Sequence, residues 1–162
     1  DGLKVDIKGD AEVYREVLGA RVDVPWRNAE EALKRGVHVE IVFLMVTGLS
    51  DREEVVEDVV ERHLKHVGED TPLHLLRYFP AYKYSEPPTP LERIEWAWKY
   101  ARREGVKFVY VGNVRGHPGE HTYCPRCGAA VIKRLGPYVI EYKLREDFRC
   151  PKCGERLPKR GR

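Results

Sequence analysis

The chain of 162 residues lacks glutamine and contains one methionine and only two asparagines, Asn28 and Asn113. Thermolabile amides are scarce in proteins adapted to heat, and such proteins are rich in charged residues, which make up 34% of this chain. No apolar run approaches the length needed to cross a bilayer, so the sequence contains no transmembrane segment. These deficits predict a heat-adapted protein that works away from the membrane.

A surplus of one charge sign is also missing. The 29 Lys and Arg residues nearly balance the 26 Asp and Glu residues, which leaves a formal charge of +3. That balance is too even to indicate nucleic-acid binding by itself. The chain begins at Asp1 without a methionine and runs directly into an apolar–polar alternation, whereas a native terminus usually frays before its first strand. We expect it to be cut from something longer.

Cysteine occurs only in two similar knuckles, Cys-Pro-Arg-Cys-Gly and Cys-Pro-Lys-Cys-Gly, which contain Cys124, Cys127, Cys150 and Cys153. The spacing within each pair lets both thiolates reach one tetrahedral ion. Two disulfides or four unrelated thiols are the alternatives, and repetition of the whole knuckle disfavours both. Four thiolates suit zinc or a single iron ion. Cysteines reserved for metal indicate a reducing cytoplasm.

The first 116 residues alternate between strand and helix patterns. Strands are predicted at Leu3–Lys8, Val37–Val46, Leu73–Phe79 and Val106–Val111. Helices are predicted at Ala11–Leu18 and Asn28–Arg35, and after two capping motifs, Ser50-Asp51-Arg52-Glu53 and Thr89-Pro90-Leu91-Glu92. This alternation indicates an α/β fold with a mostly parallel sheet, either open or part of a barrel, whose ligand site lies at the carboxyl ends of the strands. The run Val37–Val46 is nearly continuous and predicts a strand buried on both faces.

The remaining residues, 117–162, have the pattern of a small ribbon. His117–Glu120 predicts a linker, and Ala129–Tyr142 predicts a hairpin between the two knuckles. His117 and His121 lie close enough in sequence to ligate the metal, but four thiolates already complete a tetrahedron. We therefore divide the chain into an α/β unit at 1–116 and a four-cysteine zinc ribbon at 117–162.

Polar residues on the predicted strands are candidates for a binding site. Asp6 and Lys8 alternate with apolar neighbours and share one face near the end of the first strand, where they could line a cavity or form an ion pair at a sheet edge. His74, in the third strand, could be a ligand or a structural residue. The turn Thr47–Asp51 opens a helix and could receive an anion. The aromatic, proline-rich loop 79–88 could hold a substrate or simply pack.

Together these segments resemble the carboxy-terminal portion of a radical S-adenosylmethionine (SAM) enzyme of the AmmeMemoRadiSam group, related to the activating enzyme of pyruvate formate-lyase. The resemblance is carried by Asp6-Ile7-Lys8, residues 44–51, residues 74–80, Pro87-Pro88-Thr89, residues 109–113 and the two knuckles. It implies the later strands of a partial (β/α) barrel with a carboxy-terminal zinc ribbon. It also implies that Lys8, with Asp6 beside it, lies near SAM and substrate, and that His74 helps hold the adenosyl group.

The sequence departs from this family in what it omits. The Cys-x3-Cys-x2-Cys loop that holds the [4Fe–4S] cluster is absent, and so is the Gly-Gly-Glu motif that binds the SAM amine. SAM and the cluster are therefore expected only in a complete enzyme, formed with a missing amino-terminal half or a split subunit. Such an enzyme would cleave SAM for radical chemistry or to activate a partner protein. This chain alone is expected to be inactive.

A rival hypothesis is a zinc-ribbon adaptor, or a nucleic-acid-binding module, on an α/β scaffold. The ribbon offers a modest basic surface, made of Lys133, Arg134, Lys143, Arg145, Lys152 and Lys159. Acidic residues dilute it: Glu141, Glu146, Asp147 and Glu155. Nucleic acid is therefore the less favoured partner.

Overall fold

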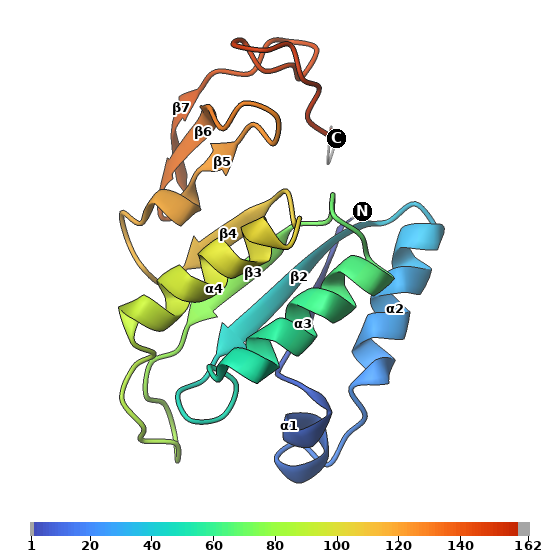
Figure 1. Ribbon diagram of the computed structural model, residues 1–162, viewed down its shortest axis with the longest axis vertical. Coiled ribbons are helices and arrows are strands. Elements are labelled where there is room, and N and C mark those ends of the chain that lie inside the picture. Colours follow the sequence, from blue (N-terminus) through green and yellow to red (C-terminus); the bar gives the residue numbers. More distant parts are fainter. Residues whose placement is uncertain (1, 159–162) are drawn as a thin grey trace.

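The computed structural model describes residues 2–158 and contains two sheets (Figure 1). The larger is a four-stranded parallel sheet made of β1 (Gly2–Ile7), β2 (His38–Met45), β3 (Leu73–Arg77) and β4 (Val109–Gly112). The strands stand side by side in chain order, β1-β2-β3-β4. The connections contain the helices α1 (Ala11–Glu16), α2 (Asp23–Lys34), α3 (Glu53–His66) and α4 (Leu91–Arg103). The α/β class and the parallel sheet are confirmed.

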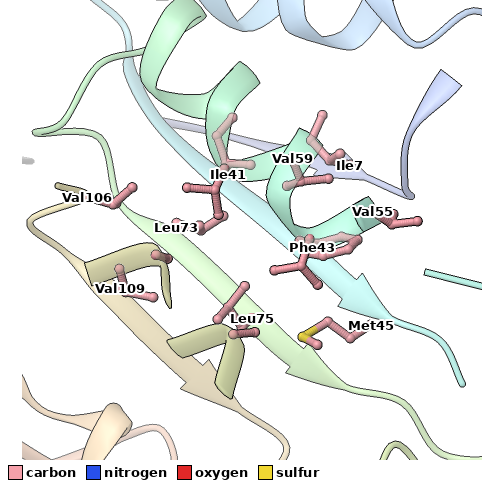
Figure 2. Packing of buried hydrophobic residues seen from close by; sticks show 14 of the residues in the cluster. Ile7, Ile41, Phe43, Met45, Val55, Val59, Leu73, Leu75, Val106 and Val109 are labelled. Atoms are coloured by element: carbon pink, nitrogen blue, oxygen red, sulfur yellow. The ribbon is translucent and has the colours of Figure 1, made fainter. Parts of the chain in front are cut away.

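One face of the large sheet packs against helices α2, α3 and α4 and forms the main core (Figure 2). Alternate strand residues such as Ile41, Phe43 and Leu75 are fully buried there against valines of α3, including Val55 and Val59. Right-handed crossovers between strands that stand in chain order place successive helices on the same face. The sheet is thus wound in one direction, with its helical cover on one side.

The opposite face is different, and it corrects one prediction. Strand β2 is not buried on both faces, because buried and half-buried residues alternate along its whole length. The half-buried set begins with His38 and Glu40 and continues into Val42 and Leu44. On β3 and β4 the same face carries His74 and Tyr110. We call this side the open face of the sheet.

The carboxy-terminal region forms a three-stranded antiparallel sheet in the order β5-β6-β7. Its strands are β5 (Thr122–Tyr123), β6 (Ala130–Leu135) and β7 (Tyr138–Tyr142), so the predicted hairpin is confirmed. Its apolar cluster contains Cys124, Cys150, Val131 and Leu157, and extends to Phe108 and Tyr110 at β4. The ribbon therefore packs against the β4 end of the large sheet.

The segment predicted as a linker, His117–Glu120, instead forms an ordered turn that connects the ribbon to α4. Residues Pro118–Glu120 form a 3₁₀ turn, η1, in which the Glu120 side chain is buried. The Glu120 carboxylate accepts hydrogen bonds from the backbone amides of Gly116 and Gly136, at 3.1 Å each. His117 Nε2 donates to Glu95 of α4 at 2.6 Å, because its Nδ1 already accepts from an amide of the turn. The ribbon is thus tied to both the turn and α4.

Helix α4 holds the ribbon through a second set of contacts. The Arg102 guanidinium lies 4.7 Å from the ring centroid of Trp98 and 5.3 Å from that of Tyr123 in the ribbon. The indole of Trp98 donates to the Val109 carbonyl at 3.1 Å. Cation–π contacts of this kind add to the apolar packing.

Both capping motifs were assigned wrongly. The Ser50 hydroxyl donates to the Leu44 carbonyl at 3.0 Å and accepts from the Val46 amide at 2.9 Å, while α3 begins at Glu53 without a side-chain cap. The Thr89 hydroxyl likewise donates to the Met45 carbonyl at 2.6 Å and accepts from the Tyr78 amide at 2.9 Å. Both hydroxyls close the ends of buried strands, where an unpaired peptide group would cost more than an uncapped helix.

Helix α2 starts at Asp23, earlier than the predicted Asn28. Its first turns contain Trp26, whose side chain is fully buried in the core. No helix within residues 2–158 is both long and apolar enough to span a membrane.

Candidate functional site

The four cysteine sulfurs of the ribbon lie together, each within 4.8 Å of the others. The Sγ atoms of Cys124 and Cys153 are 3.5 Å apart, and those of Cys127 and Cys150 are 3.7 Å apart. A tetrahedral ion with metal–sulfur bonds of about 2.3 Å requires sulfur–sulfur distances of about 3.8 Å. The cluster therefore matches four-thiolate coordination and could bind a metal ion such as zinc or iron.

The two knuckles have the same backbone geometry. Gly128 N donates to the Cys124 carbonyl at 2.9 Å, and Gly154 N donates to the Cys150 carbonyl at 3.0 Å. Both glycines have positive φ, 69° and 75°, a conformation that a side chain would strain. Backbone amides two and three positions after Cys124 and Cys150 point at the two sulfurs. Burial raises the pKa of the Cys124 thiol and outweighs its amides, whereas the pKa of Cys150 is lowered despite burial, in part by its amides, toward the thiolate form that a metal requires.

The histidines near the knuckles have other partners. His117 bonds Glu95, and His121 Nδ1 accepts from the backbone amide of Arg134 at 3.3 Å. Neither belongs to the group of side chains positioned for a metal within residues 2–158.

The second candidate region is the open face of the sheet. The Lys8 ammonium, just beyond β1, lies 3.5 Å from the Asp6 carboxylate, and both side chains are largely exposed. Asp6 pairs in register with Val42, which pairs with His74. The Cα atoms of Asp6 and His74 are therefore about 10 Å apart across the sheet. All three predicted wall residues lie on strands β1 and β3 or at their ends, but only Asp6 and Lys8 are in contact.

His74 belongs to a polar network that the sequence did not single out. Its Nε2 lies 3.1 Å from one carboxylate oxygen of Glu40, whose other oxygen lies 3.1 Å from His38 Nε2. Contact with His74, opposed by partial burial and aided by His38, lowers the pKa of the Glu40 carboxyl to about 2. Glu40 is therefore an anion at neutral pH. The sequence pattern that could have identified Glu40 is its alternation with His38 at the start of β2. The remaining residues of that strand are apolar, and the pattern was therefore overlooked.

Tyr110 extends this network to the ribbon. Its ring stacks on the His74 imidazole with a centroid separation of 5.1 Å and an interplanar angle of 24°. Its hydroxyl lies 2.9 Å from that of Thr122, which also accepts from an Arg134 guanidinium nitrogen at 2.8 Å. The Arg134 guanidinium itself lies over the Tyr110 ring, 5.6 Å from its centroid.

A cleft of about 810 Å³ separates the open face from the ribbon. The sheet contributes Lys4, Glu40, His74 and Tyr110 to it, and the ribbon contributes Ile132 and Arg134 among others. Its volume is in the range of small-molecule sites. His74 thus faces a concave region, whereas Asp6 and Lys8 are not among the described residues that line it.

In the turn Thr47–Asp51, which was predicted to receive an anion, the backbone amides donate to acceptors within the turn itself or at Val46, just before it. The Gly48 amide donates to the Asp51 carboxylate at 2.8 Å, and the next three amides all donate to the Val46 carbonyl. These groups are not directed at a ligand. The neighbouring loop is anchored to the same turn, because the Tyr84 hydroxyl donates to the Thr47 carbonyl at 2.8 Å. At the tip of that loop, Tyr82 is 95% exposed.

Comparison with known proteins gives one informative relative. No family model matches the sequence. An uncharacterized protein of Methanocaldococcus jannaschii is 39% identical in an alignment 162 positions long, which covers 97% of this chain and 48% of the relative. The chain therefore spans about half the length of this relative.

Proposed function

We propose that this chain forms the later strands of a (β/α) barrel in a radical SAM enzyme. In this proposal Asp6, Lys8 and His74 form part of the wall of the SAM and substrate cavity. The observation that carries the proposal is the open face, a side of a parallel sheet that carries Asp6, Glu40 and His74 and, within residues 2–158, has no α-helix packed on it.

The winding of the sheet supports a barrel. Parallel sheets normally have both faces covered, either by helices on two sides or by closure into a barrel. Here the strands follow chain order and the helices pack on one face, as they do in one arc of a barrel. In a closed barrel the open face would turn inward, and β1, which pairs with β2 alone in the described part of the chain, would gain another neighbour.

The chemistry of the open face also supports a cavity. A face intended for solvent has no need of a carboxylate held between two histidines, as Glu40 is held by His38 and His74. Asp6, Lys8 and His74 offer an anion, a cation and a ring with which to hold a polar, charged ligand. In the proposed enzyme, Lys8 and Asp6 orient the charged groups of SAM or substrate, and the His74 ring packs against the adenosyl group.

This sequence has no cysteines left to hold the [4Fe–4S] cluster of such an enzyme. All four cysteines belong to the knuckles, so a [4Fe–4S] cluster would depend on cysteines supplied by another segment or subunit. The greater length of the Methanocaldococcus relative is consistent with such a segment. When bound, the cluster and SAM supply a 5′-deoxyadenosyl radical that abstracts hydrogen from a substrate. We assign zinc to the knuckles, in a structural role.

The test is reconstitution. This chain is combined anaerobically with the part of the Methanocaldococcus relative that it does not match, supplied with iron and sulfide, reduced, and incubated with SAM. We expect 5′-deoxyadenosine, measured by mass spectrometry, and at least a tenfold loss with His74→Ala, the equivalent of about 1.4 kcal/mol. Lys65→Ala, at an exposed position of α3 on the opposite side of the sheet, is the control. Reduced, cluster-loaded protein that yields no 5′-deoxyadenosine would refute the assignment.

A protein-binding adaptor is the second candidate, because β7 exposes apolar side chains at the edge of the ribbon. Tyr138 is 74% exposed and Ile140 is 62% exposed. Nucleic acid fits less well, since Glu141 pairs with both Lys133 and Lys143, at 2.8 and 3.0 Å. Lys159, another predicted basic residue, lies outside the described residues. A gel-shift series across salt separates the two, because nucleic-acid binding would weaken steeply with added salt.

A further inference from the structure

We propose that the zinc ribbon is a positioning device for His74, acting through Tyr110, and that Arg134 is the ribbon residue that fixes this arrangement. The proposal rests on the proposed function in one respect, since that function gives His74 a ligand to hold. The contacts that carry it belong to the chain itself.

The first step is the packing of Tyr110 on His74. The two residues are register partners on β3 and β4, so their side chains rise from neighbouring points on the same face. Their rings stack at 5.1 Å, and the tilt of 24° is that of an offset stack. Any shift of the Tyr110 ring would therefore change the room available to the His74 imidazole.

The second step is the hold of the ribbon on Tyr110. One Arg134 nitrogen donates to both the Thr122 hydroxyl, at 2.8 Å, and the Glu120 carbonyl, at 3.3 Å. The Thr122 hydroxyl in turn lies 2.9 Å from the Tyr110 hydroxyl. Arg134 also lies over the ring of Tyr110. A single guanidinium thus holds the hydroxyl through Thr122 and the ring directly.

The third step is the opposite restraint on His74. Glu40 lies 3.1 Å from His74 Nε2 and is itself held by His38. The His74 ring therefore lies between a carboxylate from β2, which approaches its Nε2 without hydrogen-bond geometry, and a ring from β4. The remaining charged groups that border the same cleft are Lys4 from β1, Glu120 from η1 and Arg134 from β6. Of these two restraints, only the one through Tyr110 depends on the ribbon.

These contacts give the four-cysteine metal site an indirect role in the proposed cavity. A ribbon held by four thiolates keeps β5 and β6 in register. That register pairs Thr122 with Ile132 and leaves the Thr122 hydroxyl within reach of the Arg134 guanidinium, two residues further along β6. In this view the metal affects the cavity by fixing the ring that stacks on His74.

The test follows the His74 ring by NMR in the isolated, metal-loaded chain. A ring stacked on tyrosine shows a ring-current shift of its Cε1 proton, and Tyr110→Leu defines the unstacked position of this signal. We expect Arg134→Ala to move the His74 signal most of the way to that position. Arg134→Lys, which keeps the charge but not the planar fork, should move it part of the way.

The matched control is Lys133→Ala, on the same strand and paired with Glu141. It should leave the His74 signal in place. Methyl signals of Ile41 and Val59, behind the sheet, report that each variant remains folded. Removal of the metal by chelation should reproduce the effect of Arg134→Ala.

Two outcomes would overturn the proposal. One is a His74 signal that stays in its original position in Arg134→Ala, which would mean that the large sheet alone fixes the ring. The other is an equal displacement in Lys133→Ala, which would indicate general loosening of the ribbon. Neither readout requires SAM cleavage, so failure to form 5′-deoxyadenosine would remove the enzymatic assignment and leave the positioning role intact.

Discussion

The two faces of the parallel sheet are built on opposite principles. The helix-covered face contains apolar side chains such as Ile41, Phe43 and Leu75, none of which is exposed. The open face, one residue away along the same strands, carries Glu40 and His74 in a network of close polar contacts and ring contacts. Removal of apolar surface from water stabilises the first face. The second face carries polar and charged side chains, whose desolvation costs free energy.

The contrast teaches that the apolar core and the polar groups of the proposed site are separated across the thickness of one sheet. Period-two alternation lets a single strand serve both, since neighbouring side chains point to opposite faces. A substitution on the helix-covered face should therefore act mainly on the free energy of unfolding. A substitution on the open face should act mainly on ligand binding and on the ribbon.

The largest expected effect comes from the ribbon, which covers the β4 end of the open face. Cys150→Ser removes one of four thiolates, and structural zinc sites contribute on the order of 10 kcal/mol of apparent binding free energy. We expect the metal content to fall well below one equivalent and the ribbon amides to lose protection from hydrogen exchange. The amides of β2 should stay protected, with His121→Asn as the control that retains metal. Equal loss of protection in both sheets would contradict the separation.

Two adjacent residues of β2 test the contrast directly. Phe43→Ala leaves a cavity behind the sheet and should cost about 3–5 kcal/mol. Val42→Ala, on the half-buried open face, should cost about 1 kcal/mol or less, because less apolar area is removed from contact. Urea unfolding followed by tryptophan fluorescence measures both. Similar costs for the two variants would mean that the open face is also a packed core.

The sequence predicted the elements well where the signal was local. The strand and hairpin patterns and the spacing of the cysteines reflect short-range geometry, and they hold in the structure. Ser50 and Thr89 show where local reasoning fails. Each begins a motif typical of a helix cap, but a strand-end carbonyl competes for the same hydroxyl, and only the tertiary fold brings Leu44 or Met45 within reach.

The candidate site was predicted in part for a similar reason. The knuckles could be read directly because both ligand pairs are contiguous. Glu40 was missed because its strand is otherwise apolar, and the stacking of Tyr110 on His74 depends on strand register. The contact of Arg134 with Tyr110 joins segments that no pattern along the chain connects.

His63 supplies a pH test of the helix-covered side. Burial lowers the pKa of this histidine to about 4, against the effect of its Nε2 contact with the Thr71 carbonyl at 3.0 Å. The unfolded chain takes up this proton near pH 6.5 and the folded chain only near pH 4, so stability is complete above 6.5 and falls between these values. The loss should reach about 3 kcal/mol.

His63→Gln, which keeps a donor for the Thr71 carbonyl, should remove this part of the slope of stability against pH. Chemical denaturation of both proteins at pH 4.5, 5.5 and 6.5 measures it. Metal release at acid pH affects both proteins alike and cancels in the difference. An unchanged slope would show that His63 is solvated.

Glu40 supplies the corresponding test of the open face, with a smaller effect. Its pKa is lowered to about 2, so the stability it contributes is present above about pH 4.5 and is lost as the pH falls toward 2. Because the carboxyl is partly solvated, we expect this to be about 1 kcal/mol. Carbon-detected NMR titration of the carboxyl should give a midpoint near 2, rising in His74→Asn. A midpoint near 4.5 in the unmodified chain would mean that the network does not form.

The central claim is that the open face is the wall of a SAM cavity. The most direct measurement is NMR of the reconstituted complex, with this chain labelled and SAM added. The account predicts that the signals of Asp6, Lys8 and His74 shift on SAM addition while those of His63 and Val59, behind the sheet, stay fixed. If SAM is bound or cleaved and the open-face signals do not move, the cavity lies elsewhere and the account is wrong.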